Sequence, residues 1–114
     1  MVVLNTLRII GAVGTIVTGI ISLVRPLSVT GFTGLKPDGA RGLSEIRAVL
    51  GGLFIASGAA VLWLNDPAAY KTLGFAYLGT GLARLISMVI DQSRDTSNVI
   101  SAAWELLFGL VMVV

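Results

Sequence analysis

Cysteine and histidine are both missing from this chain of 114 residues. Haem, iron–sulfur, zinc and chlorophyll sites usually take their protein ligands from these two residues, so the sequence predicts no cofactor and no metal site. Disulfides are excluded outright. Charge is also scarce, because Asp, Glu, Lys and Arg make up 12% of the chain, against about 25% in a typical soluble domain.

Long hydrophobic runs stand where charge is absent. The composition is 55% hydrophobic, the mean hydropathy is +0.93, and neither 9–24 nor 48–64 contains a charged residue. Each run approaches the roughly 20 apolar residues that cross a hydrocarbon core about 30 Å thick. Arg25 and Pro26 follow the first run in place of a small-residue cleavage site, so we interpret it as a retained helix and not as a signal peptide.

The sequence therefore predicts an all-α fold: a single domain over 1–114 that forms a membrane-embedded four-helix bundle of up-down order. Pro26 ends the first helix, and Pro67 stands at the first position of the third, where its missing N–H does no harm. Asp38 or Ser44 is a candidate cap for the second helix, after the glycine-rich segment 26–43, which we predict to be the one substantial loop. The expected helices cover approximately 3–25, 41–64, 67–91 and 97–114.

Polar and small residues follow one face of the first predicted helix. They recur at spacings of three and four, which places them in a single stripe of Arg8, Gly11, Thr15, Thr18, Ser22 and Arg25. Helices in lipid pack through small and hydroxyl residues, since apolar side chains gain nothing by leaving an apolar solvent. We expect the stripe to face other helices, and Gly51, Gly52 and Gly58 to allow similar close approach of the second helix.

The distribution of basic residues predicts the topology. One membrane face holds Arg25, Lys36, Arg41, Arg47 and Arg94, and the other holds Lys71 with Arg8 a little inside. The positive-inside rule then places the loops 26–43 and 91–96 in the cytoplasm and both termini outside. With a net charge of +2 and no basic patch, the predicted partners are membrane lipids and other transmembrane helices, and no nucleic acid. Arg8, near only Asn5 or the Asp66 turn, is predicted to snorkel to the interface.

Two opposite charges lie at matching depth in the last two helices. Arg84 precedes Asp91 by seven residues and Glu105 follows Ser97 by eight, which puts both about 10–12 Å below the same face. An isolated charge at the centre of a helix costs about 2.5–3.5 kcal/mol, and pairing offsets part of that cost.

Glu45 and Arg47, at the entrance of the second helix, extend this pair into a predicted intramembrane cluster of Glu45, Arg47, Arg84 and Glu105. The cluster is typical of a proton or ion relay, or of a site for a lipid headgroup or another anionic ligand. Alternatively, it is a buried salt bridge that fixes helix register.

The stretch Ala40-Arg41-Gly42-Leu43-Ser44-Glu45-Ile46-Arg47-Ala48, followed by Gly51-Gly52-Leu53, carries a family resemblance. It resembles the signature of a bacterial family of small four-helix membrane proteins described only as a domain of unknown function. The resemblance continues in Gly81-Leu82-Ala83-Arg84-Leu85 and in Glu105-Leu106. It implies a bacterial inner membrane location and four spans, and it implies no activity.

Three functions are compatible with these features. The first is a non-enzymatic accessory or scaffold subunit that packs against partner helices in a homo- or hetero-oligomer. The second is an oligomeric transporter or channel component in which Glu105 and Arg84 face a polar path and Glu45 stands at its mouth. The third is an enzyme acting on a lipid or quinone, with Asp91, Asp95 and Glu45 around a divalent metal. Their spacing matches no lipid-enzyme motif, so we expect the protein not to be an enzyme.

Overall fold

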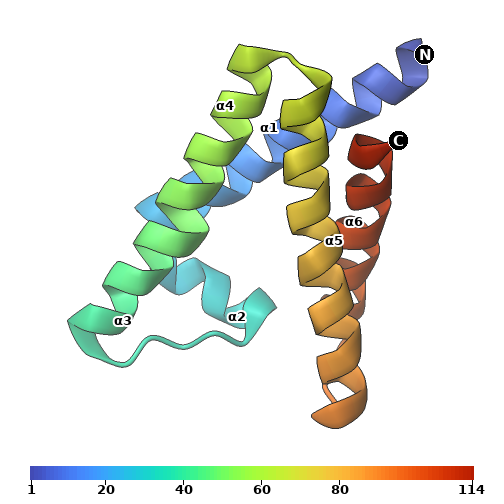
Figure 1. The fold of residues 1–114 in the computed structure, drawn as a ribbon. Helices are drawn as coiled ribbons and strands as arrows, with labels where there is room; N and C mark the ends of the chain where they lie inside the picture. The colour runs from blue at the N-terminus through green and yellow to red at the C-terminus, as the bar shows by residue number, and fades with distance from the viewer. The chain divides into compact units, whose positions relative to one another are not determined.

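The structure is a computed structural model that describes residues 1–114. Helices contain 87% of the residues and there are no strands. The predicted all-α class is therefore confirmed (Figure 1). The elements in chain order are α1 (Val2–Val24), η1 (Pro26–Val29), α2 (Thr30–Thr33), α3 (Gly39–Glu45), η2 (Ile46–Leu53), α4 (Phe54–Leu64), α5 (Pro67–Ile90) and α6 (Thr96–Val113).

Four helical stretches are long and apolar enough to cross a membrane. They are Val2–Val24, Gly39–Leu64, Pro67–Ile90 and Thr96–Val113, and the second of them joins α3, η2 and α4 without a break. Their ends lie within one or two residues of the expected ones. Large apolar side chains such as Phe75 and Leu107 are more than half exposed, as is typical of surfaces that face hydrocarbon rather than water.

The chain divides into two compact units. The hairpin unit consists of Met1–Ile9 and Leu64–Val114, and the N-terminal unit consists of Ile10–Trp63. Each unit has its own tightly packed pair of helices. The organisation of 1–114 as one domain stays a prediction.

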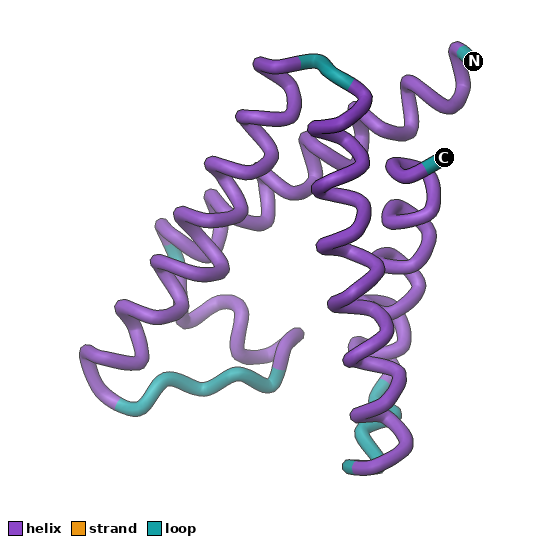
Figure 2. The backbone as a smooth tube through the Cα atoms, in the orientation of Figure 1, coloured by secondary structure: helices purple, strands orange, loops and turns teal.

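In the hairpin unit, α5 and α6 run antiparallel side by side (Figure 2). Glycines set their separation: a Cβ added to Gly74 would lie 2.8 Å from the Cβ of Met112 and 2.9 Å from the carbonyl oxygen of Gly109. Only a residue without a side chain fits there, as in other close helix pairs in lipid. The hairpin begins as predicted, with Pro67 first in α5 and Asp66 as its cap, whose Oδ1 accepts from Ala68 N at 2.8 Å.

In the N-terminal unit, glycines likewise bring α1 against the second span. A Cβ on Gly19 would lie 2.8 Å from both Gly51 O and Ile55 N, and one on Gly58 would lie 2.8 Å from Ala12 O. The predicted polar stripe of α1 is partly buried. Its buried members are Gly11, Thr15 and Ser22, whereas Thr18 and Arg25 are exposed.

The segment 26–43 contains more structure than a loop. Two short helices, η1 and α2, occupy its first half, and Gly34 and Gly39 have positive φ of 73° and 70°. Asp38 stands at the cap position of α3, but its side chain makes no capping hydrogen bond. Asp38 therefore has the predicted position but not the predicted hydrogen bond. Ser44 cannot cap the helix, because it lies within α3.

The middle of the second span departs from the regular helix that we expect from the sequence. From Ile46 to Leu53, η2 is a π-helix, in which each N–H bonds to the carbonyl five residues earlier. Such wide turns are rare in proteins, and many of those that do occur lie at functional sites. This one contains Arg47, Gly51 and Gly52.

Candidate functional site

Arg84 of α5 and Glu105 of α6 form a two-pronged ion pair. Arg84 Nε donates to Glu105 Oε2 at 2.8 Å, and Nη2 donates to Oε1 at 2.6 Å. The Glu105 side chain is 9% exposed and that of Arg84 is 30% exposed. This parallel geometry is the strongest form of the arginine–carboxylate interaction, because both hydrogen bonds are charge-assisted.

A third hydrogen bond continues the pair into a small network. Arg84 Nη1 donates to Asn98 Oδ1 at 2.7 Å, and Asn98 Nδ2 donates to the carbonyl and hydroxyl oxygens of Ser93 at 2.8 and 3.1 Å. The Ser93 contacts fix which end of the amide faces the guanidinium. No buried side-chain nitrogen or oxygen lacks a partner, so the network is fully satisfied, which is the condition under which buried polar groups stabilise a fold.

Room for the pair comes from Gly81, one turn before Arg84 on the same face of α5. A Cβ at Gly81 would lie 2.9 Å from Leu106 Cδ2 and 3.3 Å from Glu105 Cβ. The missing side chain lets α6 approach until the carboxylate reaches the guanidinium. In the segment Gly81-Leu82-Ala83-Arg84, Gly81 thus lets α6 come close to α5, and Arg84 places its charge one turn further along the same face.

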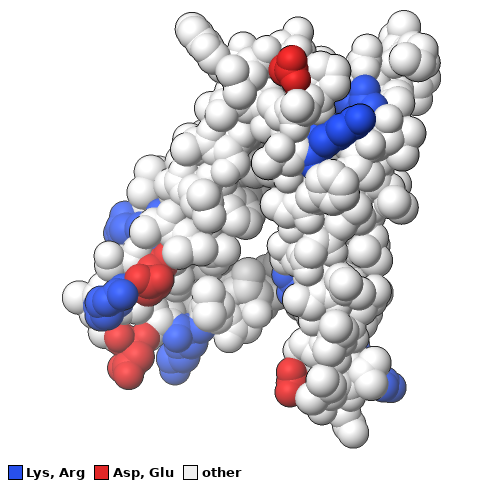
Figure 3. All heavy atoms as spheres, viewed as in Figure 1, with Lys and Arg blue, Asp and Glu red and all other residues white.

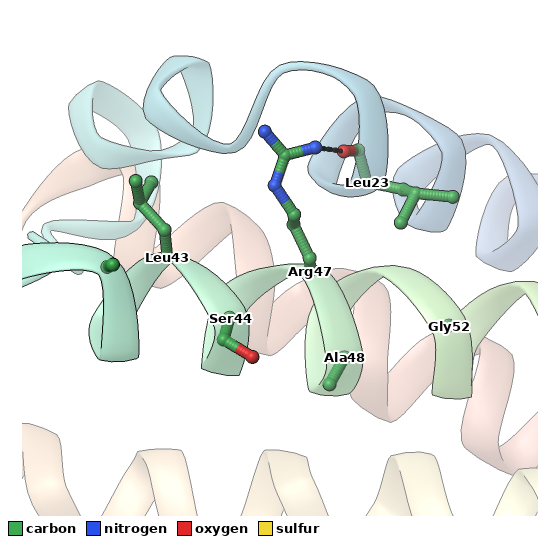
Figure 4. A pocket seen from close by; sticks show the side chains of 7 residues that line it. Leu23, Leu43, Ser44, Arg47, Ala48 and Gly52 are labelled. Atoms are coloured by element: carbon green, nitrogen blue, oxygen red, sulfur yellow. Dashed lines mark hydrogen bonds between the residues drawn. The ribbon is translucent and has the colours of Figure 1, made fainter.

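The other two members of the predicted cluster have different partners in the N-terminal unit. Glu45 pairs with Arg41 one turn earlier in α3, and the two side chains are 55% and 78% exposed. Arg47 Nη1 donates to the carbonyl oxygen of Leu23 at 2.6 Å (Figure 4). Exposed pairs such as Arg41–Glu45 contribute about 0–1 kcal/mol. The joint action of Glu45, Arg47, Arg84 and Glu105 as one site stays a prediction.

Charged side chains of the N-terminal unit gather at the end that holds α3 (Figure 3). The second span contributes Arg41, Glu45 and Arg47 there, and the preceding segment contributes Lys36 and Asp38. Beyond Arg47 this span carries no further charge up to Leu64. The change from charged to apolar surface is therefore sharp along this helix.

Arg8 has a partner that sequence reasoning missed. Its Nε donates to Val111 O at 3.1 Å, and its Nη1 donates to Asn5 Oδ1 at 3.2 Å. Val111 belongs to the last turn of α6, whose carbonyls have no partner within the helix and carry partial negative charge. The expected contact with Asn5 is confirmed, but the expectation of no other partner is wrong, because the sequence does not show which backbone carbonyl a helix end presents.

Two open hollows lie in the N-terminal unit. The larger measures about 550 Å³ and is lined by Leu23, Ala40, Leu43, Ser44, Arg47, Ala48 and Gly52. The smaller measures about 280 Å³ and lies between 35–38 and the start of the second span. In neither unit do three acidic side chains come close enough together to hold a metal ion.

These features define the chain as an all-helical protein with four helices long and apolar enough to span a membrane, two of which are joined by an internal ion pair. Within that class, the chain belongs to the family described as "Domain of unknown function (DUF4345)", whose model matches residues 3–114. The resemblance noted in the sequence is thereby confirmed. No curated protein and no solved structure matches the chain.

Proposed function

We propose that the protein is a small accessory or scaffold subunit that packs against partner helices in a membrane complex. The observation that supports this most is the closed state of the Arg84–Glu105 pair. Both carboxylate oxygens accept from the same guanidinium, whose third hydrogen bond goes to Asn98. Charges paired in this way hold α5 against α6, and the guanidinium balances the negative charge that would otherwise attract a transported cation.

One exposed face of α5 is a candidate surface for a partner helix. Thr72, Ala76, Gly79 and Ala83 recur at helical spacing and are all exposed, and a Cβ at Gly79 would have no atom within 4 Å. Small residues on a lipid-facing side let another helix approach closely, with gain in van der Waals contact.

Extraction into mild detergent or lipid nanodiscs tests the proposal, followed by mass measurement of the intact particle and identification of what travels with it. We expect a stoichiometric partner that Gly79→Leu displaces without lowering the melting temperature, since the added side chain enters open space. Gly31→Leu, also at an open position, is the matched control and keeps the partner. A bare monomer would contradict the proposal.

The alternative is an oligomeric transporter or channel component. It is motivated by the position of Arg84 within an apolar helix and by its 30% exposed side chain, because intramembrane charges often mark ion paths. Flux into liposomes should then fall in Glu105→Gln and in Arg84→Ala. Unchanged flux in both variants would count against transport.

We propose a bacterial inner membrane location, with 26–43 and 91–96 in the cytoplasm and both termini outside. The absence of native cysteine makes labelling unambiguous. Gly31→Cys should react with an impermeant maleimide only from the cytoplasmic side, and Lys71→Cys only from the outer side. Labelling of both from the same side would refute the topology.

A further inference from the structure

Arg47 marks the level at which the apolar surface of the N-terminal unit begins. The uncharged run of α1 ends at Val24, and the uncharged run of the second span starts at Ala48. Arg47 Nη1 bonds Leu23 O at 2.6 Å, so these two boundaries lie side by side. In a membrane protein, such a boundary coincides with the transition from hydrocarbon to lipid headgroups.

The positive charge of Arg47 is not neutralised within the unit. Its hydrogen-bond partner is a carbonyl, which carries only a partial charge, and the nearby Glu45 is paired with Arg41. A guanidinium has five N–H donors, so four of them remain available on a side chain that is exposed. Arg25, two residues beyond Leu23, forms no ion pair either and adds a second positive charge.

The larger hollow opens beside this guanidinium (Figure 4). Arg47 points toward Leu23 at the end of α1 and Leu43 points to the same side of its helix, whereas Ser44 and Ala48 point to the other side. Ala48 and Gly52 extend the lining into the uncharged part of the span. Apart from Ser44 and Arg47, the lining is apolar. The hollow measures about 550 Å³ and is wide open, so a ligand held there keeps part of its surface toward the surroundings, as a lipid at the surface of a membrane protein does.

The π-helix brings the charged and the small wall positions together. In an α-helix, two residues five positions apart point about 140° away from each other, because each residue turns the helix by about 100°. In η2 the residue five positions earlier is the hydrogen-bonding neighbour, and a Cβ at Gly52 would lie 3.9 Å from Arg47 O, with nothing else beyond its own stretch of helix within 4 Å. Gly52 therefore lies nearer to the face of Arg47 than it would in an α-helix, and its missing side chain leaves the hollow open there.

We propose that this hollow binds one anionic phospholipid, with the phosphate on the Arg47 guanidinium and an acyl chain along Ala48 and Gly52. A planar guanidinium matches two oxygens of a phosphate, and the apolar wall begins at the depth where acyl chains begin. The uncompensated charge of Arg47 favours a headgroup with net negative charge over a zwitterionic one, in which the headgroup's own cation already balances the phosphate. The site is separate from the Arg84–Glu105 pair and does not depend on the accessory-subunit role.

Native mass spectrometry of the purified protein in mild detergent tests this site, by titration with phosphatidylglycerol and with phosphatidylcholine of identical acyl chains. We expect one phosphatidylglycerol to bind about tenfold more tightly than phosphatidylcholine, and Arg47→Gln to remove most of that difference, since a charge-assisted contact is lost and only the charge of Arg25 remains. Gly52→Leu should weaken both lipids, because its side chain fills the hollow. Glycerol phosphate without acyl chains should not displace the bound lipid.

Two controls match these variants. Arg94→Gln makes the same charge change in the turn before α6, and Gly31→Leu adds the same side chain at an open position of α2. Both should keep the preference for phosphatidylglycerol. Equal binding of the two lipids to the wild type would overturn the proposal, as would a preference that is undiminished in Arg47→Gln. Should Arg47→Gln fail to fold, Gly52→Leu decides alone, and unchanged lipid binding in that variant overturns the site.

Discussion

The two units pack their helices in a similar way, but the arginine within each unit has a different kind of partner. In the hairpin unit, Arg84 meets a full carboxylate charge on Glu105, which is almost completely buried. In the N-terminal unit, Arg47 meets only the carbonyl of Leu23 and stays exposed. Glycines allow close approach in both, at Gly74 in one and at Gly19 in the other. The comparison suggests that the neutralised arginine serves the fold, whereas the other remains available to a ligand.

Glu105→Ala should produce the largest loss of stability. Removal of one partner of a buried pair costs about 3–5 kcal/mol, and we expect the lower end because Arg84 keeps 30% of its side chain exposed. Glu45→Ala should cost less than about 1 kcal/mol, since the Arg41–Glu45 pair is exposed. Unfolding by SDS titration in mild detergent measures both, and equal losses would break the distinction between the two pairs.

Gly74→Ala and Gly19→Ala should each cost about 1–3 kcal/mol, because the new Cβ would meet neighbouring atoms at 2.7–2.9 Å. Gly79→Ala is the control in open space, and there alanine should stabilise the helix by up to about 1 kcal/mol. The same titration gives the sign of each change. Stabilisation at Gly74 or Gly19 would mean that the backbones are not in contact.

Arg47→Ala should lower the stability by about 1 kcal/mol, the typical net value of one hydrogen bond. Leu23 O, at the exposed end of α1, remains accessible to water once the guanidinium is gone. Melting in detergent measures this loss beside that of Glu105→Ala. A loss in Arg47→Ala as large as in Glu105→Ala would show that Arg47, too, serves mainly the fold.

The double variant Arg84→Met with Glu105→Leu should have the smallest effect, close to that of the wild type. Apolar residues of similar volume often replace a buried ion pair without loss, because the desolvation cost of the charges disappears as well. The coupling between the two positions then follows from comparison with each single variant. A double variant as unstable as Glu105→Ala would indicate that Asn98 also requires the guanidinium.

The sequence predicted best those features that depend only on position along a helix, namely where each helix begins and ends and how deep a residue lies. Uncharged runs and prolines placed the four long helices within two residues of their observed ends, since length and hydropathy decide membrane crossing. Depth along a helix follows from residue counting, and Arg84 and Glu105, placed at equal depth in this way, form an ion pair in the structure.

Contacts with backbone carbonyls could not be predicted in this way. Arg8 bonds Val111 O and Arg47 bonds Leu23 O, and a carbonyl at a helix end has no residue-specific signature in the sequence. The π-helix was also missed, because the segment Ile46–Leu53 is apolar apart from Arg47 and its pattern does not distinguish one helical period from another. The hollow depends on the Arg47–Leu23 contact and on the π-helix, so it could not be predicted from the sequence either.

The wide turn at Ile46–Leu53 also sets the sensitivity of the second span to changes in chain length. Loss of one residue from an α-helix shortens it by about 1.5 Å and rotates one side by about 100° relative to the other. A π-helical segment holds one residue more than the α-helix that would replace it, so loss of one residue from Ile46–Leu53 leaves the helix on either side in nearly the same orientation and removes only the wide turn beside Arg47 and Gly52. A single-codon deletion here therefore reshapes one turn and the hollow beside it, a far more local change than a deletion in the continuous helices α5 or α6.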